Sequence, residues 1–163
     1  MLVGIISDTH DQAARTSLAV QKLITAGVDA LFHCGDLVEP EMTACFTALP
    51  FYFVFGNNDE YYASEIREAI AQAPEAICLE WGDTVELSGK RIAITHGHLN
   101  SEMDRLLDAN PDYLLTGHTH IASDVKSGAT RHINPGALHR ARRYSVATLN
   151  LATDELKFIE IPR

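Results

Sequence analysis

Carboxylate, imidazole and amide side chains that can bind a divalent metal stand together in five short clusters of the sequence. The clusters are Asp8-Thr9-His10, Gly35-Asp36, Gly56-Asn57-Asn58-Asp59, Thr95-His96-Gly97-His98 and Gly117-His118-Thr119-His120. Ligands of these types suit Mn, Fe, Zn, Ni or Mg and require no thiolate. The clusters therefore predict a metal-dependent site.

Each cluster alone has an ordinary structural explanation. Asp8 could cap a helix, Asn57 and Asp59 could satisfy their own backbone in a turn, and an isolated His-x-His pair is weak evidence. In an extended backbone, however, residues two positions apart point the same way, so Asp8 and His10 could chelate one ion. The same reasoning applies to the pair His118-Thr119-His120. Five such clusters together favour metal binding.

The number of ligand-type residues indicates two ions. Seven ligands are too many for one ion with open positions, but they fit two ions that share a bridging carboxylate. Asp36 stands alone in its cluster and is the natural bridge. Two ions ~3.5–4 Å apart can clamp phosphoryl oxygens and lower the pKa of a bridging water toward ~7. Such a site would supply both a nucleophile and charge stabilisation.

The elements that must position these clusters are short apolar runs. Each cluster ends one such run, at residues 2–6, 30–32, 51–55, 91–95 and 113–116. Continuous apolar runs are typical of strands in parallel sheets. Helical spacing predicts helices over residues 14–26, 41–49 and 102–108. This alternation predicts α/β layering with a site at the carboxyl ends of strands.

The second half of the chain favours antiparallel pairing. Residues 84–87 and 91–95 flank Ser88-Gly89-Lys90, a hairpin signal. Further strands are expected in a tail, at residues 122–126, 130–133, 145–151 and 156–161. With 163 residues and 46% hydrophobic content, the chain can bury one core, so we expect a single domain over residues 1–163.

The bulk composition excludes several classes of function. Thirteen basic and 22 acidic residues give a net charge of -9, which argues against general binding to nucleic acid or to an anionic membrane. Three cysteines without CxxC spacing argue against a disulfide framework and suit a reducing compartment, by default the cytoplasm. The start MLVGIISDTH is a poor signal peptide, and no stretch approaches 18 uninterrupted apolar residues.

In these clusters the chain resembles the calcineurin-like metallophosphoesterase superfamily, whose pattern runs D-x-H, G-D, G-N-x-D/E, H, G-H-x-H. The start GIISDTHD and the segment Ile133-Asn134-Pro135-Gly136 look like its compact bacterial and archaeal phosphodiesterase branch, which also contains the retromer subunit Vps29. The resemblance implies an α/β fold with two mixed β-sheets packed as a sandwich and flanked by helices. It also implies a hydrolase that cleaves a phosphodiester or phosphomonoester by attack of a hydroxide bridging two metal ions.

The resemblance further implies a role for each clustered residue. One ion would be held by Asp8, His10, Asp36 and His120, and the second by Asp36, Asn57, His96 and His118. Asp59 would orient neighbouring groups from outside the coordination sphere. Manganese is the expected metal, with Fe, Ni, Zn and Mg as alternatives.

One departure from the family pattern concerns the proton that the leaving group needs. Many members have a histidine directly after the ligand asparagine, where this chain has Asn58. An amide can bond a phosphate oxygen but cannot act as a general acid. His98 could substitute, although a structural histidine is an equally good interpretation. We therefore expect good leaving groups, such as aryl oxygens, to be preferred.

Several alternatives stay open at this point. The basic cluster His139 to Arg143 could recognise a second phosphate or a nucleotide, or could form a subunit contact in a homo-oligomer. His33 is best interpreted as a hydrogen-bonded core histidine. A Vps29-like protein-interaction module with weak or no catalysis is the alternative to an enzyme, and a single-metal hydrolase of another substrate is a weaker one. The complete set of ligand-type residues favours the enzyme.

Overall fold

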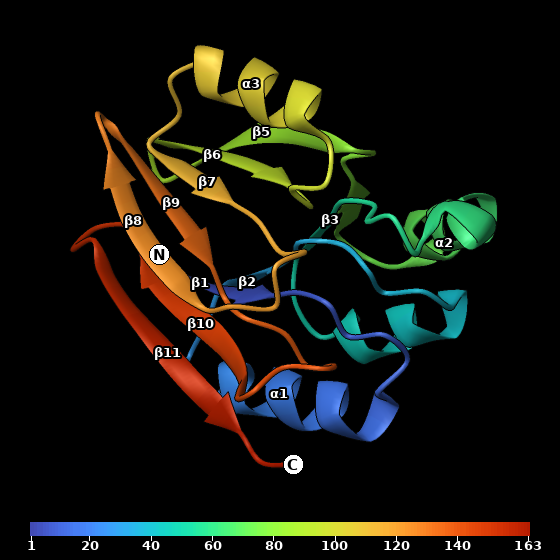
Figure 1. Cartoon of the computed structure of the whole chain (residues 1–163). Coiled ribbons are helices and arrows are strands. Elements are labelled where there is room, and N and C mark those ends of the chain that lie inside the picture. Colours follow the sequence, from blue (N-terminus) through green and yellow to red (C-terminus); the bar gives the residue numbers. More distant parts are fainter.

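Two mixed β-sheets form the centre of the computed structural model, which describes residues 1–163 (Figure 1). The first sheet has the strand order β11 (Glu155–Ile161), β10 (Tyr144–Asn150), β1 (Leu2–Ile6), β2 (Ala30–His33), β3 (Phe51–Phe53), β4 (Ala76–Cys78). The second has the order β5 (Gly82–Leu87), β6 (Lys90–Thr95), β7 (Tyr113–Leu115), β9 (Thr130–Asn134), β8 (Ser123–Ser127). The predicted pair of mixed sheets is confirmed.

Strand direction explains where the polar clusters lie. Neighbours among β1, β2, β3 and β4 are parallel, as are β6, β7 and β9 in the second sheet. The antiparallel strands β10, β11, β5 and β8 lie toward the sheet edges. Parallel strands bring their carboxyl ends to one edge. The loops that follow β1, β2 and β3 therefore share one edge of the first sheet, and the loops that follow β6 and β7 share one edge of the second.

Helices cover the outer faces of the sheets (Figure 1). They are α1 (Ala13–Thr25), the 3-10 segments η1 (Pro40–Phe46) and η2 (Glu60–Tyr62), α2 (Ala63–Gln72) and α3 (Asn100–Asp108). None of them has the length and apolar character needed to span a membrane. In place of the helix expected over residues 41–49, the structure has the shorter η1, which ends at Phe46; helical geometry is also disfavoured at Leu49, which precedes Pro50. The elements α2 and β4 were not predicted.

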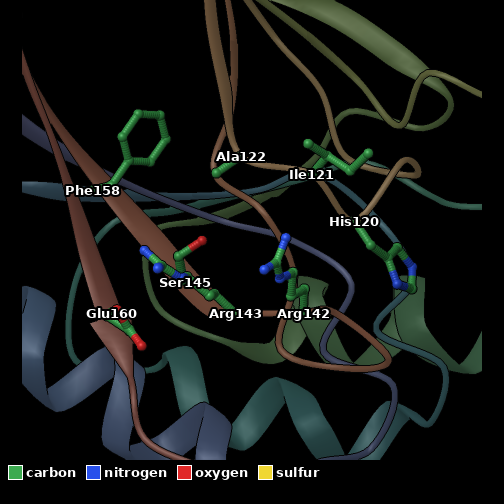
Figure 2. A pocket seen from close by; sticks show the side chains of 8 residues that line it. All are labelled: His120, Ile121, Ala122, Arg142, Arg143, Ser145, Phe158 and Glu160. Carbon is green, nitrogen blue, oxygen red and sulfur yellow. The ribbon is translucent and has the colours of Figure 1, made fainter.

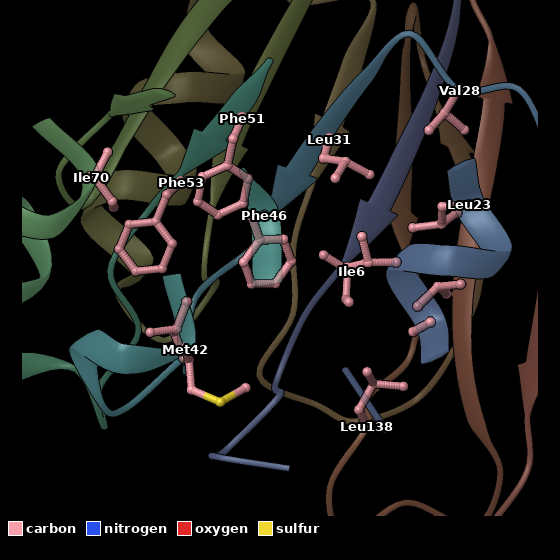
Figure 3. Close-up of a cluster of buried hydrophobic side chains, with 14 of the residues drawn as sticks. Ile6, Leu23, Val28, Leu31, Met42, Phe46, Phe51, Phe53, Ile70 and Leu138 are labelled. Atoms are coloured by element: carbon pink, nitrogen blue, oxygen red, sulfur yellow. The ribbon is translucent and has the colours of Figure 1, made fainter. Parts of the chain in front are cut away.

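The core lies on both faces of the first sheet. Alternate residues of a strand point to opposite faces, so Ile6 packs toward α1 and η1 with Leu23 and Phe46 (Figure 3), whereas Ile5 packs between the sheets with Ile94. Leu106 of α3 covers the outer face of the second sheet. Fully burying one such side chain contributes about 1.5–3 kcal/mol. The layers are thus helix, sheet, sheet, helix, and the sandwich expectation is confirmed.

Candidate metal centre

Residues from both sheets converge where the strands end. Potential ligand atoms of Asp8, His10 and His120 lie within 4.8 Å of one another, and so do those of Asp8, Asp36 and His96. These residues follow four strands, β1, β2, β6 and β7. Ligand-type side chains from distant parts of the chain therefore meet at one place.

Asp36 lies at the centre of this group. Its Oδ2 atom is 3.3 Å from Nε2 of His10 and 3.4 Å from Nε2 of His96. Burial would raise the pKa of Asp36, but the two imidazoles and the backbone N–H of Asn58 outweigh it and hold that pKa well below its usual range. The carboxylate is therefore ionised and faces an imidazole on each side.

Asp8 is completely buried, and its two oxygens differ in their surroundings. Oδ2 accepts hydrogen bonds from the Ser7 hydroxyl at 2.6 Å and from the backbone N–H of His118 at 3.1 Å. Oδ1 has no hydrogen-bond partner and lies 3.1 Å from Nε2 of His120. One oxygen thus holds the carboxylate in place while the other is presented to the site.

His96 is held in one orientation from behind. Its Nδ1 lies 2.7 Å from the carbonyl oxygen of Cys34, and a nitrogen in that position must carry the proton, since a carbonyl only accepts. The lone pair is then on Nε2, which is the arrangement that metal-binding histidines commonly show. Burial opposes protonation of His96, but the Asp36 carboxylate outweighs it and raises the pKa.

Buried polar atoms without hydrogen-bond partners test whether a metal fits here. Asp8 Oδ1, His10 Nε2 and His96 Nε2 are such atoms, and all three belong to the converging group. An unsatisfied buried polar atom costs about 1–3 kcal/mol. Divalent cations would satisfy carboxylate and imidazole atoms together. The donor set therefore fits divalent metal ions.

The backbone at the site departs from the extended conformation that the sequence suggested. Asp8, His10, His118 and His120 have φ values of 52°, 40°, 66° and 59°, in the left-handed region that costs a non-glycine residue about 1–3 kcal/mol. Asp8 and His10 still approach one another, with Nε2 of His10 4.0 Å from Oδ1 of Asp8.

The expectation that His118 and His120 point the same way is wrong. The His120 ring lies 5.6 Å from that of His10, whereas the His118 ring lies 5.1 Å from that of His96. The left-handed backbone at both residues turns them toward different neighbours. Each therefore joins a different half of the site.

The loop after β3 carries Asn57 and Asn58. Only Asn58 is hydrogen-bonded to Asp36. Asn57 is exposed, and no hydrogen bond occupies its side chain. Asn58 donates its backbone N–H to Oδ1 of Asp36 at 2.9 Å and its side-chain amide to Oδ2 at 2.7 Å. The Asn58 amide is thus directed at the carboxylate, and not at the open part of the site.

Asp59 is buried beneath the same loop. Its Oδ2 accepts the backbone N–H groups of Asp36 at 2.9 Å and Gly56 at 2.6 Å, and its Oδ1 accepts that of Val38 at 2.7 Å. Burial raises the pKa of Asp59 to about 6, although these donors oppose the shift. Asp59 therefore braces two loops without facing the site.

His98 and His33 take different positions. The His98 ring packs 5.3 Å from His96 and 5.9 Å from Trp81. Burial, and then the neighbouring imidazoles of His96 and His118, lower the pKa of His98, which favours a structural role over that of proton donor. His33 is fully buried, accepts the Gly35 N–H on Nδ1 at 3.2 Å and bonds Thr9 through Nε2 at 3.1 Å. The interpretation of His33 as a core histidine is confirmed.

Two residues of the basic cluster, His139 and Arg140, lie beside the proposed metal ligands. A hollow of about 380 Å³, the metal-site hollow, is lined by His10, Asp36, Asn57, Asn58, His118, His120, His139 and Arg140. The His139 ring lies 4.7 Å from that of His10. Both His139 and Arg140 belong to the basic cluster His139 to Arg143, which the resemblance placed near the active site and whose role the sequence left open.

Glycine is required where loops meet closely. A Cβ on Gly117 would lie 1.9 Å from the Ser7 hydroxyl oxygen and 2.7 Å from Oδ2 of Asp8. A Cβ on Gly56 would lie 2.2 Å from Oδ1 of Asp36. No side chain fits in either place, so these glycines allow the loops to approach the carboxylates.

Comparison with known proteins identifies similar chains. A family model described as a calcineurin-like phosphoesterase superfamily domain matches residues 1–154. The phosphodiesterase MJ0936 of Methanocaldococcus jannaschii is 29% identical over 139 residues, which cover 83% of each chain. The metallophosphoesterase YsnB of Bacillus subtilis, whose name carries the qualifier "probable", is 28% identical, with 98% of this chain and 91% of YsnB covered.

Solved structures share the fold. A structure described as a novel archaeal phosphodiesterase superposes with a TM-score of 0.83 at 24% identity, covering 98% of this chain and 99% of that one. Wild-type Vps29 of Entamoeba histolytica, solved with zinc, superposes with a TM-score of 0.68 at 18% identity, covering 98% and 99%. At these identities the likeness concerns the fold alone.

Proposed function

The chain belongs to the calcineurin-like phosphoesterase superfamily and is a metal-dependent phosphoesterase, and from this premise we propose that it hydrolyses a phosphodiester at a site for two divalent ions. The observation that carries the proposal is the position of Asp36 Oδ2 between Nε2 of His10 and Nε2 of His96. One carboxylate oxygen between two imidazoles is what a bridging ligand requires. The named phosphodiesterase of M. jannaschii supports the substrate class.

We assign the ligands in two groups that share Asp36. Asp8, His10 and His120 complete one group, and Asn57, His96 and His118 complete the other. The opposite turns of His118 and His120 support this division. When bound, the ions supply Lewis acidity to phosphoryl oxygens and lower the pKa of a coordinated water. Manganese is our first choice, because carboxylate, imidazole and amide ligands suit it.

The protein groups have separate tasks around the phosphate ester. Asn58 holds Asp36 through two hydrogen bonds, and Asp59 holds the loops on both sides of it. Arg140 lines the metal-site hollow and can attract the anionic substrate. None of these groups is an evident proton donor for the leaving oxygen, and burial lowers the pKa of His139, the neighbouring imidazole of the hollow, which disfavours its protonated form. We therefore propose a preference for aryl esters, whose leaving oxygens need little protonation.

Turnover of bis(p-nitrophenyl) phosphate with added Mn tests this function. We expect hydrolysis by the wild-type chain and none by Asp36→Asn, which keeps the side-chain shape and removes the bridging charge. Glu60→Gln, an exposed acidic residue close in sequence, is the matched control and should retain activity. A folded wild-type chain that binds Mn but hydrolyses neither diesters nor monoesters would contradict the proposal.

A Vps29-like interaction module is the second candidate, and it is less well supported. The similarity to Vps29 is one of fold, at 18% identity. Every ligand-type residue of the family pattern is present here, and three unpartnered buried atoms face one another. Because a Vps29 structure also holds zinc, turnover is the measurement that separates the two candidates, and metal binding alone does not.

We also propose that residues 1–163 act as one domain and that the protein works in a reducing compartment such as the cytoplasm. Support for the first point comes from strand β10, which packs with both α1 and β1 and so ties the end of the chain to its start. Support for the second comes from the free thiols of Cys34, Cys45 and Cys78.

A further inference from the structure

A second, larger hollow lies beside the metal-site hollow, and we call it the flanking groove. Its volume is about 760 Å³, within the usual range for small-molecule sites. The groove and the metal-site hollow share His120. Figure 2 shows His120 at one end of the groove and Phe158 at the other, with Arg142 and Arg143 between them. A molecule bound at the metal centre could therefore extend into the groove past His120.

The arginines of the groove differ from most arginines of the chain. Six of the nine arginines make hydrogen bonds to protein groups, namely Arg15, Arg67, Arg91, Arg105, Arg131 and Arg163. The guanidinium groups of Arg142 and Arg143 are exposed and have neither a hydrogen bond nor an ion pair with the protein. In a chain with a net charge of -9, carboxylate partners are abundant. Two unpaired cations that line the same groove are therefore available to an external anion.

The groove also has an apolar wall. Ile121 is 68% exposed and Phe158 is 43% exposed, although both side chains are large and hydrophobic. They come from distant parts of the chain, Ile121 from the loop after β7 and Phe158 from β11. Ala122 lies beside Ile121 in the groove. Apolar surface of this kind binds flat or bulky organic groups.

The remaining polar residues narrow the choice of ligand. The Ser145 hydroxyl donates to the carbonyl of Pro135 at 2.7 Å, so its proton is already used. Glu160 is exposed on β11 at the far end of the groove (Figure 2) and makes no ion pair with either arginine. The arginines are therefore the donors available to a ligand, and Glu160 opposes a negative charge that comes too close to β11.

We propose that the flanking groove binds the organic substituent of the phosphate ester, and that this substituent has an apolar face and a second anionic group. The apolar face lies against Ile121 and Phe158, and the anion, a carboxylate or a second phosphate, binds Arg142 and Arg143. The ester phosphate itself lies at the metal centre. This inference rests on the proposed function and specifies its substrate class.

Calorimetric titration of the Mn-loaded chain tests the proposal. The ligands are phenylphosphonate, 4-carboxyphenylphosphonate, 1,4-phenylenebisphosphonate and 4-(trimethylammonio)phenylphosphonate, whose C–P bond is not hydrolysed, with inorganic phosphate as the reference. We expect the two acidic ligands to bind roughly tenfold more tightly than phenylphosphonate, and the cationic ligand more weakly. The stronger of the two acidic ligands identifies the second group as carboxylate or phosphate.

Three variants locate the effect. The double variant Arg142→Gln/Arg143→Gln should abolish the preference for acidic ligands and leave the Kd of inorganic phosphate unchanged. Glu160→Gln should strengthen binding of the acidic ligands. Arg91→Gln, which removes a cation bonded to the Asn110 carbonyl, is the matched control and should change nothing.

Two results would overturn the inference. One is equal affinity for acidic, neutral and cationic ligands, or a preference that survives the double variant. The other is a dimer in solution that Phe158→Ser dissociates, because the groove would then be a subunit contact. If bis(p-nitrophenyl) phosphate is hydrolysed while either result is obtained, only this inference fails. If the chain neither hydrolyses that ester nor binds inorganic phosphate, the proposed function fails with it.

Discussion

Oδ2 of Asp59 accepts the backbone N–H of Asp36 at 2.9 Å, so a carboxylate with no exposed surface positions the loop of the proposed bridging ligand. The same oxygen accepts the N–H of Gly56, which ties the loop after β3 to the loop after β2. The precision of the site therefore depends on a residue that contacts no substrate.

Asp59→Asn should weaken both the fold and the metal centre. An asparagine has one carbonyl oxygen, so it cannot accept all three N–H groups that Asp59 accepts. We expect the free energy of unfolding to fall by about 2 kcal/mol and Mn affinity to fall roughly 10–100-fold. Urea unfolding and Mn titration measure the two effects, with Glu60→Gln as the control. Unchanged Mn affinity would show that Asp59 does not position the site.

Gly56→Ala tests the close approach of two loops. Its Cβ would lie 2.2 Å from Oδ1 of Asp36, so we expect displacement of Asp36 and loss of Mn-dependent turnover. Gly128→Ala is the matched control, because Gly128 has a φ of 62° and open space around the added Cβ. It should cost about 1 kcal/mol of stability from backbone strain and leave turnover intact. Equal turnover by the two variants would refute the account of Gly56.

The fold and the site could be predicted from the sequence to different extents. Apolar runs that end in Asp8, Asp36 and His96 sufficed to predict strands with ligand-type residues at their carboxyl ends, because parallel strands share an edge. The separate directions of His118 and His120 could not be predicted, since they depend on left-handed backbone at residues that do not favour it.

Other features depend on contacts between segments distant in the sequence. The hydrogen bonds from Asn58 to Asp36 and the groove between Arg142 and Phe158 exist only once the sheets are assembled. The helix α2 has only a sparse local signal, because Ile66 and Ile70, four residues apart, are its only fully buried side chains. Strand β4 has three residues and one exposed side chain, too short a pattern to recognise.

Asn58→His should change the leaving-group preference. The wild-type chain is expected to hydrolyse aryl diesters better than alkyl phosphates, because Asn58 cannot donate a proton as an acid. A histidine there could protonate an alkoxide, so we expect kcat/KM for alkyl esters to rise by about 10²-fold, with little gain for p-nitrophenyl esters. Asn58→Ala is the control and should lower both, since it removes a hydrogen bond to Asp36. Best activity of the wild type on simple alkyl monoesters would contradict this reasoning.

Because His33 is buried, we expect the stability of the metal-free chain to depend on pH. Burial lowers the pKa of His33 to about 3, whereas an unfolded histidine titrates near ~6.5. The folded state therefore binds fewer protons, and stability is lost as pH falls from about 6.5 toward 3. Between pH 7 and pH 5 this loss is about 2 kcal/mol for the single group.

Urea unfolding in EDTA at both pH values measures the effect. The difference between pH 7 and pH 5 should be smaller in His33→Gln than in the wild type by the amount attributed to His33. Each chain is compared with itself at the two pH values, so any effect of the substitution on the free energy of unfolding that does not depend on pH cancels. An identical difference in both chains, or an NMR titration in which His33 protonates near pH 6, would contradict the buried neutral histidine.

Anomalous diffraction from crystals of the Mn-loaded chain tests the central claim most directly. We predict two manganese peaks ~3.5–4 Å apart that share an oxygen of Asp36. Asp8, His10 and His120 should contact one peak, and Asn57, His96 and His118 the other. A single peak, or a second peak that does not contact Asp36, would contradict the two-ion site.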